Sequence, residues 1–116
     1  MNLVMLIGNL ATDVELREFG EEKRLATFRL AVDRESKDDE ADFFRISVWD
    51  RQAQTCADYL AKGRMVAVEG RLRTRSWEDN GEKRSRVEVV ARRVEFLPSP
   101  GSSSGGEVVP FEAAVA

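Results

Sequence analysis

Arginine and aromatic side chains alternate between residues 71 and 77, in the order Arg-Leu-Arg-Thr-Arg-Ser-Trp. A β-strand sends alternate side chains to opposite faces, so a strand here gathers three arginines and a tryptophan on one face. These residues are Arg71, Arg73, Arg75 and Trp77. Guanidinium groups neutralise phosphates and an indole ring stacks on a base. The pattern therefore predicts a surface for a single strand of nucleic acid.

A second alternation runs from residue 43 to residue 49 and sorts two kinds of side chain. Phe44, Ile46 and Val48 fall on one face, which we expect in the core. The opposite face holds Phe43, Arg45, Ser47 and Trp49. This second set predicts an exposed binding surface, with Phe43 and Trp49 as base-stacking residues. The alternative for Trp49 is a core position, and for Trp77 it is core or subunit packing.

Basic residues are the second component of this predicted surface. We expect seven of them to contact phosphates: Arg45, Lys62, Arg71, Arg73, Arg75, Arg84 and Arg86. The alternative is a solvent-exposed strand face with no ligand. The net charge of −3 does not oppose the prediction, because residues 13–42 carry 11 acids and 6 bases whereas residues 43–96 carry 8 acids and 12 bases. Local charge steers a polyanion, and the basic half holds both tryptophans.

Several kinds of catalysis are excluded by composition. The chain has no histidine, so it lacks the commonest general base and metal ligand. Cys56 is the only cysteine, which rules out an internal disulfide, makes a thiolate zinc site very improbable, and suits a small buried residue. We expect no cofactor, no metal and no enzymatic activity. The remaining catalytic alternative is a metal-dependent nuclease that uses Asp33, Asp38 and Asp42.

The elements that carry these residues follow from periodicity and turn signals. Strands are expected over about 3–8, 25–32, 43–49, 65–77 and 83–96, with an exposed charged loop over 33–42. A helix is expected over 50–63, with Asp50 as N-cap and Gly63 as C-terminal cap. Asn80-Gly81 predicts a tight hairpin turn. Three strands, one short helix and two strands are the order of the all-β OB fold, a five-stranded barrel with the helix between strands three and four.

The domain is expected to end near residue 97. Residues 98–106 have the Pro-, Gly- and Ser-rich composition of a flexible linker, and residues 107–116 form a short apolar end, so residues 98–116 are predicted to be a tail. No apolar run approaches the roughly 18 residues that cross a membrane, and the first residues lack signal-peptide features. We therefore expect a cytoplasmic, nucleoid-associated protein.

Taken together, several blocks of residues 1–97 resemble bacterial single-stranded DNA-binding proteins. The blocks are Met1-Asn2-Leu3-Val4, Ile7-Gly8-Asn9-Leu10, Asp13 to Arg17, Phe43-Phe44-Arg45, Tyr59 to Gly63, and Val68 to Trp77. The resemblance implies an OB-fold subunit that assembles as a homotetramer, or less often as a dimer. It also implies binding of single-stranded DNA with little sequence preference, in replication, recombination or repair.

The resemblance assigns base stacking to Phe43, Trp49 and Trp77. A further stacking aromatic of the family is replaced by Ser36, and Phe19 is a weaker candidate. Family members usually end on an acidic tip that closes with Pro-Phe and recruits DNA-processing enzymes. Here five residues follow Pro110-Phe111, so we do not expect that recruitment, and a short-tailed paralogue is indicated. The alternative function is an OB module that binds protein or structured RNA.

Overall fold

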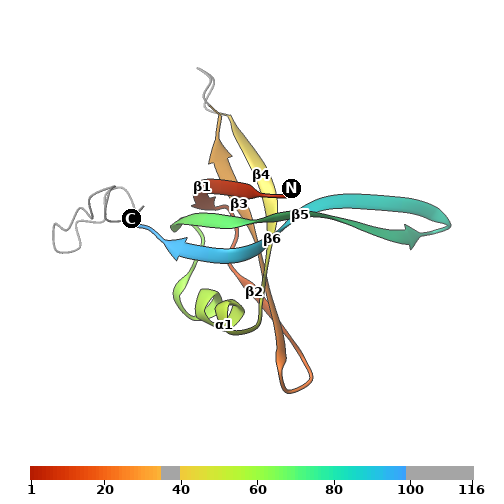
Figure 1. Cartoon of the computed structure of the whole chain (residues 1–116), viewed down its shortest axis with the longest axis horizontal. Coiled ribbons are helices and arrows are strands. Elements are labelled where there is room, and N and C mark those ends of the chain that lie inside the picture. The colour runs from red at the N-terminus through yellow and green to blue at the C-terminus, as the bar shows by residue number, and fades with distance from the viewer. Residues whose placement is uncertain (35–39, 99–116) are drawn as a thin grey trace.

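The computed structural model describes residues 1–34 and 40–98. Its elements, in chain order, are β1 (Val4–Leu10), β2 (Glu15–Phe19), β3 (Lys23–Asp33), β4 (Ala41–Trp49), α1 (Asp50–Tyr59), β5 (Met65–Asp79) and β6 (Glu82–Phe96). All five predicted strands and the helix are present in the expected order (Figure 1).

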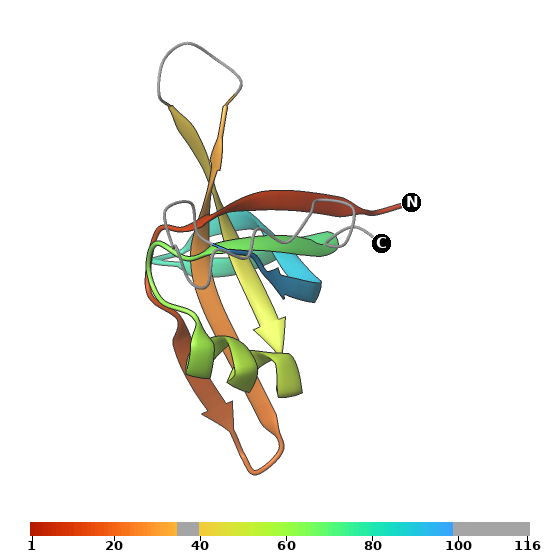
Figure 2. The ribbon, with the colours of Figure 1, turned by 90° about the vertical axis from the view of Figure 1, so that its left-hand side faces the viewer.

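Five of the strands close into a ring. β1 pairs antiparallel with β5 on one side and with β3 on the other, β5 pairs with β6, and β4 pairs with β3. A short parallel pairing, Ile46 with Val89 and Ser47 with Val90, joins β4 to β6 and completes the ring. α1 packs against β3 at one end of the ring (Figure 2).

The sequence prediction missed β2, which pairs only with β3 and extends the ring as a hairpin. Its residues Glu-Leu-Arg-Glu-Phe are nearly all exposed, with only Leu16 half-buried. A strand that buries one side chain leaves no clear hydrophobic alternation in the sequence.

The core lies inside the ring and was largely predicted by strand alternation. Phe28 and Leu30 of β3 and Ile46 and Val48 of β4 are buried there, and Phe44 packs against them. α1 contributes Ala53 and Cys56 to the same core. Alternate positions on each strand therefore face inward, as expected for a sheet closed on itself.

The helix is shorter than predicted and its ends differ. Trp49 occupies the N-cap position without a side-chain bond, and Asp50 is the first helical residue, with a φ of 63°. The helix ends at Tyr59 because Leu60 is extended and buried. Gly63 does not cap it; its positive φ serves the following turn, where its N–H donates to the carbonyl of Leu10 at 2.8 Å.

The β5–β6 hairpin projects from the ring as an arm that we define as residues 71–87 (Figure 1). β1 pairs with β5 only as far as Gly70, and β4 pairs with β6 no earlier than Val89. Every residue of the arm is exposed except Arg73, which is half-buried. Val87 alternates with Val89 along β6 but is 60% exposed, because the ring ends before it.

A β-bulge at Glu69 and Gly70 marks the base of the arm. A Cβ atom on Gly70 would lie 2.2 Å from the carbonyl oxygen of Val90, so only glycine fits this crossing. In the part of the chain that the structure describes, no helix is long and apolar enough to cross a membrane.

Candidate nucleic-acid interface

The two alternating runs of the sequence lie on one continuous surface. On the arm, residues directly opposite each other share a face, and Arg73 is opposite Glu88, Arg75 opposite Arg86, and Trp77 opposite Arg84. Arg45 of β4 and Arg73 of β5 both contact Glu88, so the β4 run faces the same way as the β5 run. We call this surface the aromatic–arginine face: Phe43, Arg45 and Trp49 on the ring, and Arg71, Arg73, Arg75, Trp77, Arg84 and Arg86 at or beyond the base of the arm.

Glu88 lies at the centre of this face and was not singled out by sequence reasoning. Its side chain is only 1% exposed. One carboxylate oxygen accepts hydrogen bonds from Nε, at 3.1 Å, and Nη2 of Arg73. The other oxygen lies 3.6 Å from Nε of Arg45 and accepts a hydrogen bond from the Ser47 hydroxyl at 3.4 Å. Ser47 was predicted to be exposed; it is buried because Glu88 and its arginines cover it.

On the ring, two aromatic residues of β4, one exposed and one half-buried, lie on either side of Arg45. Phe43 is 53% exposed, and the guanidinium of Arg29 lies 5.1 Å from the centre of its ring. Trp49 is half-buried and its ring centre is 6.3 Å from that of Phe19, at an angle of 33°. Trp49 is therefore not a core residue, and Phe19, the weaker sequence candidate, lies beside it.

Arg29 is a second residue that the sequence analysis left out of the site. It alternates with the core residues Phe28 and Leu30 along β3, and it is opposite Arg45 in the β3–β4 pairing. The signal was available, since a charged residue between two core positions must point outward. The sequence did not show that Arg29 lies beside Phe43, because that contact depends on the pairing of β3 with β4.

On the arm, Trp77 is 36% exposed and the guanidinium of Arg86 lies 5.4 Å from its ring centre. Trp77 belongs to no buried cluster of the described residues, so it is not core. Arg75 and Arg86 are directly opposite and neither forms an ion pair with any residue in 1–34 or 40–98. Like charges placed opposite destabilise a sheet, and a bound anion relieves that repulsion.

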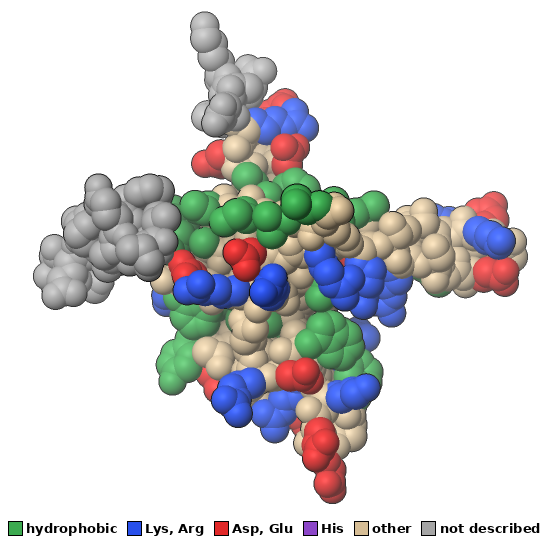
Figure 3. All heavy atoms as spheres, viewed as in Figure 1, with side chains coloured by type: hydrophobic (Ala, Val, Ile, Leu, Met, Phe, Trp, Pro, Cys, Tyr) green, Lys and Arg blue, Asp and Glu red, His purple; other side chains and the backbone are tan. Residues whose placement is uncertain are grey.

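The remaining predicted cations differ in their surroundings. Arg84 lies near two acids of the arm tip, 3.6 Å from Asp79 and 3.8 Å from Glu82. Arg71 is exposed at the base of the arm, where Figure 3 shows Lys and Arg side chains gathered. Lys62 lies in the loop between α1 and β5, where its backbone N–H donates to Asp13 at 2.9 Å. No contact among the described residues joins Lys62 to the aromatic–arginine face.

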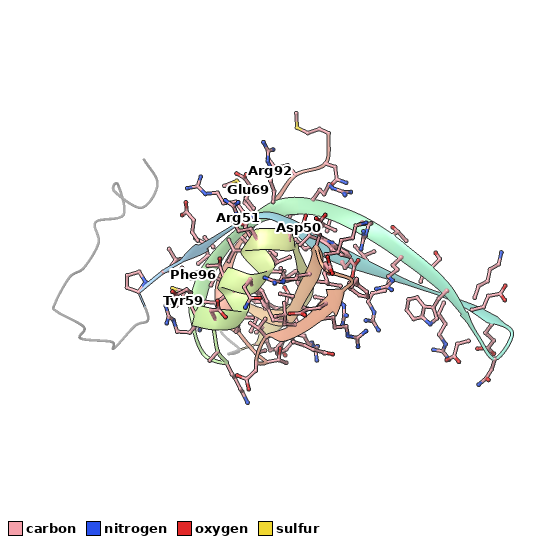
Figure 4. All side chains as sticks on the ribbon, turned by 90° about the horizontal axis from the view of Figure 1, so that it is seen from below. Asp50, Arg51, Tyr59, Glu69, Arg92 and Phe96 are labelled. Carbon is pink, nitrogen blue, oxygen red and sulfur yellow. The ribbon has the colours of Figure 1, made fainter. Side chains whose placement is uncertain are left out.

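The side of the ring opposite the arm has a different character (Figure 4). There Tyr59 and Phe96 form an aromatic pair with ring centres 6.5 Å apart, and no arginine lies over either ring in the described part of the chain. Among residues 1–34 and 40–98, the aromatic rings with a guanidinium group over them, Phe43 and Trp77, both lie on the aromatic–arginine face. Tyr59, which is exposed, offers a matched comparison for the aromatic residues of that face.

The described residues form no candidate catalytic site. Within residues 1–34 and 40–98, no three His, Cys, Asp or Glu residues are grouped as metal ligands would be. Of the carboxylates considered for a nuclease, Asp42 accepts a hydrogen bond from Arg34 at 2.8 Å, and Asp38 lies outside the described residues, as does Ser36. Burial raises the pKa of the Cys56 thiol to about 11, which disfavours the nucleophilic thiolate.

Comparison with known proteins identifies the family of the chain. The sequence pattern of the family described as "Single-strand binding protein family" matches residues 1–97. The chain is 43% identical over 111 residues to "Single-stranded DNA-binding protein 3" of Listeria innocua, a match that covers 91% of this chain and 69% of the relative. It is 45% identical over 111 residues to "Single-stranded DNA-binding protein" of Clostridium tetani, covering 91% of this chain and 77% of the relative.

Proposed function

The chain belongs to the single-strand binding protein family, and from this membership we propose that it binds single-stranded DNA in replication, recombination or repair. The family has the OB fold, so the five-stranded ring with one helix is the fold that the sequence predicted. The family consists of binding proteins, and the chain is accordingly not an enzyme. The observation that carries the proposal is the single outward face on which aromatic rings and arginines alternate.

In the proposed mechanism, Phe43, Trp49 and Trp77 stack on bases of one strand. Each stacked base contributes roughly 1–3 kcal/mol, and stacking accepts any base because every base has a π face. Duplex DNA hides its base faces, so the duplex cannot use these rings. Selectivity for single strands then follows from ring exposure without any reading of base edges.

Arginines of the same face hold the phosphates. Arg71, Arg75 and Arg86 suit this role best, because none has an acidic partner in the described part of the chain. Arg45 and Arg73 contribute through N–H groups that Glu88 does not use, since a guanidinium carries five donors. Arg84 contributes less because of its neighbouring acids, and Lys62 extends the path beyond the face. Contacts of this kind release counterions, so affinity falls as salt rises.

We also propose a homo-oligomer, with a tetramer favoured and a dimer possible. Leu3, Met5 and Ile7 form an exposed apolar stripe along β1, visible beside the arginines in Figure 3. Residues 4–8 pair with β5 on one side, and among the described residues nothing pairs on their other side. An apolar strand with an open edge suits pairing with a second copy. Light scattering of Met5→Glu against the wild type tests this, and an unchanged mass would contradict it.

The domain assignment completes the proposal: residues 1–97 bind DNA and residues 98–116 form a tail. Of the tail, Pro110-Phe111 and the acids Glu107 and Glu112 lie outside the described residues. Two acids compete weakly with DNA for a basic face, so deleting residues 107–116 should leave the affinity nearly unchanged. A large gain in affinity after deletion would contradict this expectation.

Binding of labelled oligo-dT, measured by anisotropy beside duplex DNA and tRNA, tests the function. We expect tight binding of oligo-dT, weak binding of duplex, weaker binding of all three at high salt, and no cleavage with magnesium. Preference for tRNA would favour the structured-RNA alternative. No binding of any nucleic acid would favour a protein-binding module, and the proposed function would fall.

A further inference from the structure

Glu88 joins the arm to the ring through side-chain contacts on the aromatic–arginine face, in addition to the two hydrogen bonds that the Asn2 side chain forms with the backbone of Leu72. It is the first buried residue of β6 after the exposed arm. Arg73, its cross-strand partner, is the one half-buried residue of the arm. Arg45 reaches the same carboxylate from β4, which the arm does not pair with.

The negative charge of Glu88 is unfavourable for the DNA binding that we propose for this face. A carboxylate in the middle of a surface that binds a polyanion repels the ligand, and it reduces the charge of Arg45, Glu88 and Arg73 together to +1. Burial of that carboxylate also carries a desolvation penalty, which the hydrogen bonds from Arg73 and Ser47 offset. A buried ion pair of this kind is better explained by the geometry that it specifies than by stability or attraction.

The relevant geometry is the angle of the arm, which decides whether one DNA strand can contact the ring and the arm together. The stacking rings are divided between the ring of strands, which holds Phe43 and Trp49, and the arm, which holds Trp77. An unsupported two-stranded hairpin is only marginally stable, so its direction must be fixed at its base. The Arg45–Glu88–Arg73 bridge connects β4, β6 and β5 at that base.

We propose that Glu88 is a positioning residue that holds the arm at the angle where Trp77 and the aromatic residues of β4 contact the same DNA strand. The proposal rests on the proposed function. Glu88 acts through Arg45 and Arg73 and touches no DNA itself. Its loss therefore uncouples the arm from the ring and weakens binding, even though the face becomes more positive.

The test is a double-mutant cycle between Glu88 and Trp77, four residues beyond Arg73, with oligo-dT affinity as the readout. Glu88→Gln keeps the shape and removes the charge; we expect it to weaken binding about three- to tenfold. Trp77→Ala should then lower the affinity less in the Glu88→Gln background than in the wild type. Glu95→Gln is the matched control, since Glu95 lies on β6, pairs with Arg93, and gives the same change in charge.

Each outcome of this experiment decides the proposal. Equal or tighter binding by Glu88→Gln, or an unchanged cost of Trp77→Ala, would overturn it. If Glu88→Gln does not fold, as judged by circular dichroism, the cycle is run with Arg45→Lys, which keeps the charge and breaks the bridge from β4. Loss of coupling there supports the proposal and full coupling overturns it. Failure of the wild type to bind oligo-dT would instead remove the proposed function.

Discussion

The ring and the arm carry similar residues on the proposed DNA-binding face but support them differently. On the ring, Phe43 and Trp49 lie on a strand whose other face is core, and Arg45 is held by the buried Glu88. On the arm, both faces of the hairpin are exposed, and Arg75 and Arg86 lie opposite each other without an acid in the described part of the chain. In the proposed mechanism the ring thus supplies fixed contacts, whereas the arm supplies reach and charge that no acid neutralises.

This difference indicates how one small domain can bind a flexible strand without reading its sequence. Preorganised rings on the core-backed strand reduce the conformational entropy lost on binding. An exposed arm can lie along the strand for a greater length than the ring alone. The bulge at Glu69 and Gly70, the Glu88 carboxylate and the hydrogen bonds between Asn2 and Leu72 all lie where the two regions meet.

The largest predicted effect comes from the base of the arm. Gly70→Ala places a Cβ atom against the Val90 carbonyl and should lower the free energy of unfolding by about 3 kcal/mol. Gly81→Ala at the arm tip meets no neighbour within 4 Å and strains only its own positive φ, for about 1 kcal/mol. Chemical denaturation measures both, and equal losses would contradict the distinction between base and tip.

The next effect separates the two tryptophans. Trp77→Ala should reduce oligo-dT affinity by about 1–3 kcal/mol and leave thermal unfolding almost unchanged, because Trp77 packs against no core residue. Trp49→Ala should reduce affinity and also stability, since Trp49 is half-buried beside Phe19. Tyr59→Ala, an exposed aromatic outside the face, is the control and should bind normally. A loss of stability in Trp77→Ala would assign that residue to packing.

A smaller effect compares two arginines of the arm. Arg75→Gln should reduce the salt dependence of binding, the slope of log affinity against log salt, by about 0.7. It should also raise the melting temperature slightly, because repulsion from Arg86 is removed. Arg84→Gln should change the slope less, since Asp79 and Glu82 lie near Arg84. Equal slopes for the two variants would contradict the assignment of phosphate contacts.

The smallest effect is expected at Cys56, which reports on the ring alone. Its pKa is raised to about 11 by burial, so little thiolate forms at neutral pH and a thiol reagent should react slowly in the folded state. Trp77→Ala should not change that rate, whereas Gly70→Ala should increase it. Faster labelling in Trp77→Ala would show that the arm and the ring do not unfold separately from each other.

Sequence alternation predicted which face each residue occupies, but not how exposed that face is. Phe44, Ile46 and Val48 were assigned correctly, because a core must receive one apolar face. Ser47 was assigned to the correct face with the wrong exposure, and Val87 is exposed although it shares a face with the buried Val89. Their burial depends on neighbouring strands, through Glu88 above Ser47 and through the end of the ring before Val87.

The place of Glu88 could have been predicted from the turn. A two-residue loop at Asn80-Gly81 pairs Asp79 with Glu82, and counting back along both strands pairs Arg73 with Glu88. The contact between Arg45 and Glu88 could not have been predicted. It depends on the parallel pairing of β4 with β6, which spans only two residue pairs and leaves no pattern in the local sequence. A tight turn, and the strand register that it sets, can be predicted from sequence, whereas the pairing that closes the ring cannot.

The central claim is that ring and arm bind one DNA strand together, and the most direct measurement uses fluorescence of single-tryptophan variants. Trp49→Phe leaves Trp77 as the only tryptophan, and Trp77→Phe leaves Trp49. During titration with oligo-dT, both variants should be quenched over one shared concentration range, and duplex DNA should quench neither. Quenching of only one tryptophan, or of the two at separate concentrations, would contradict a single shared face.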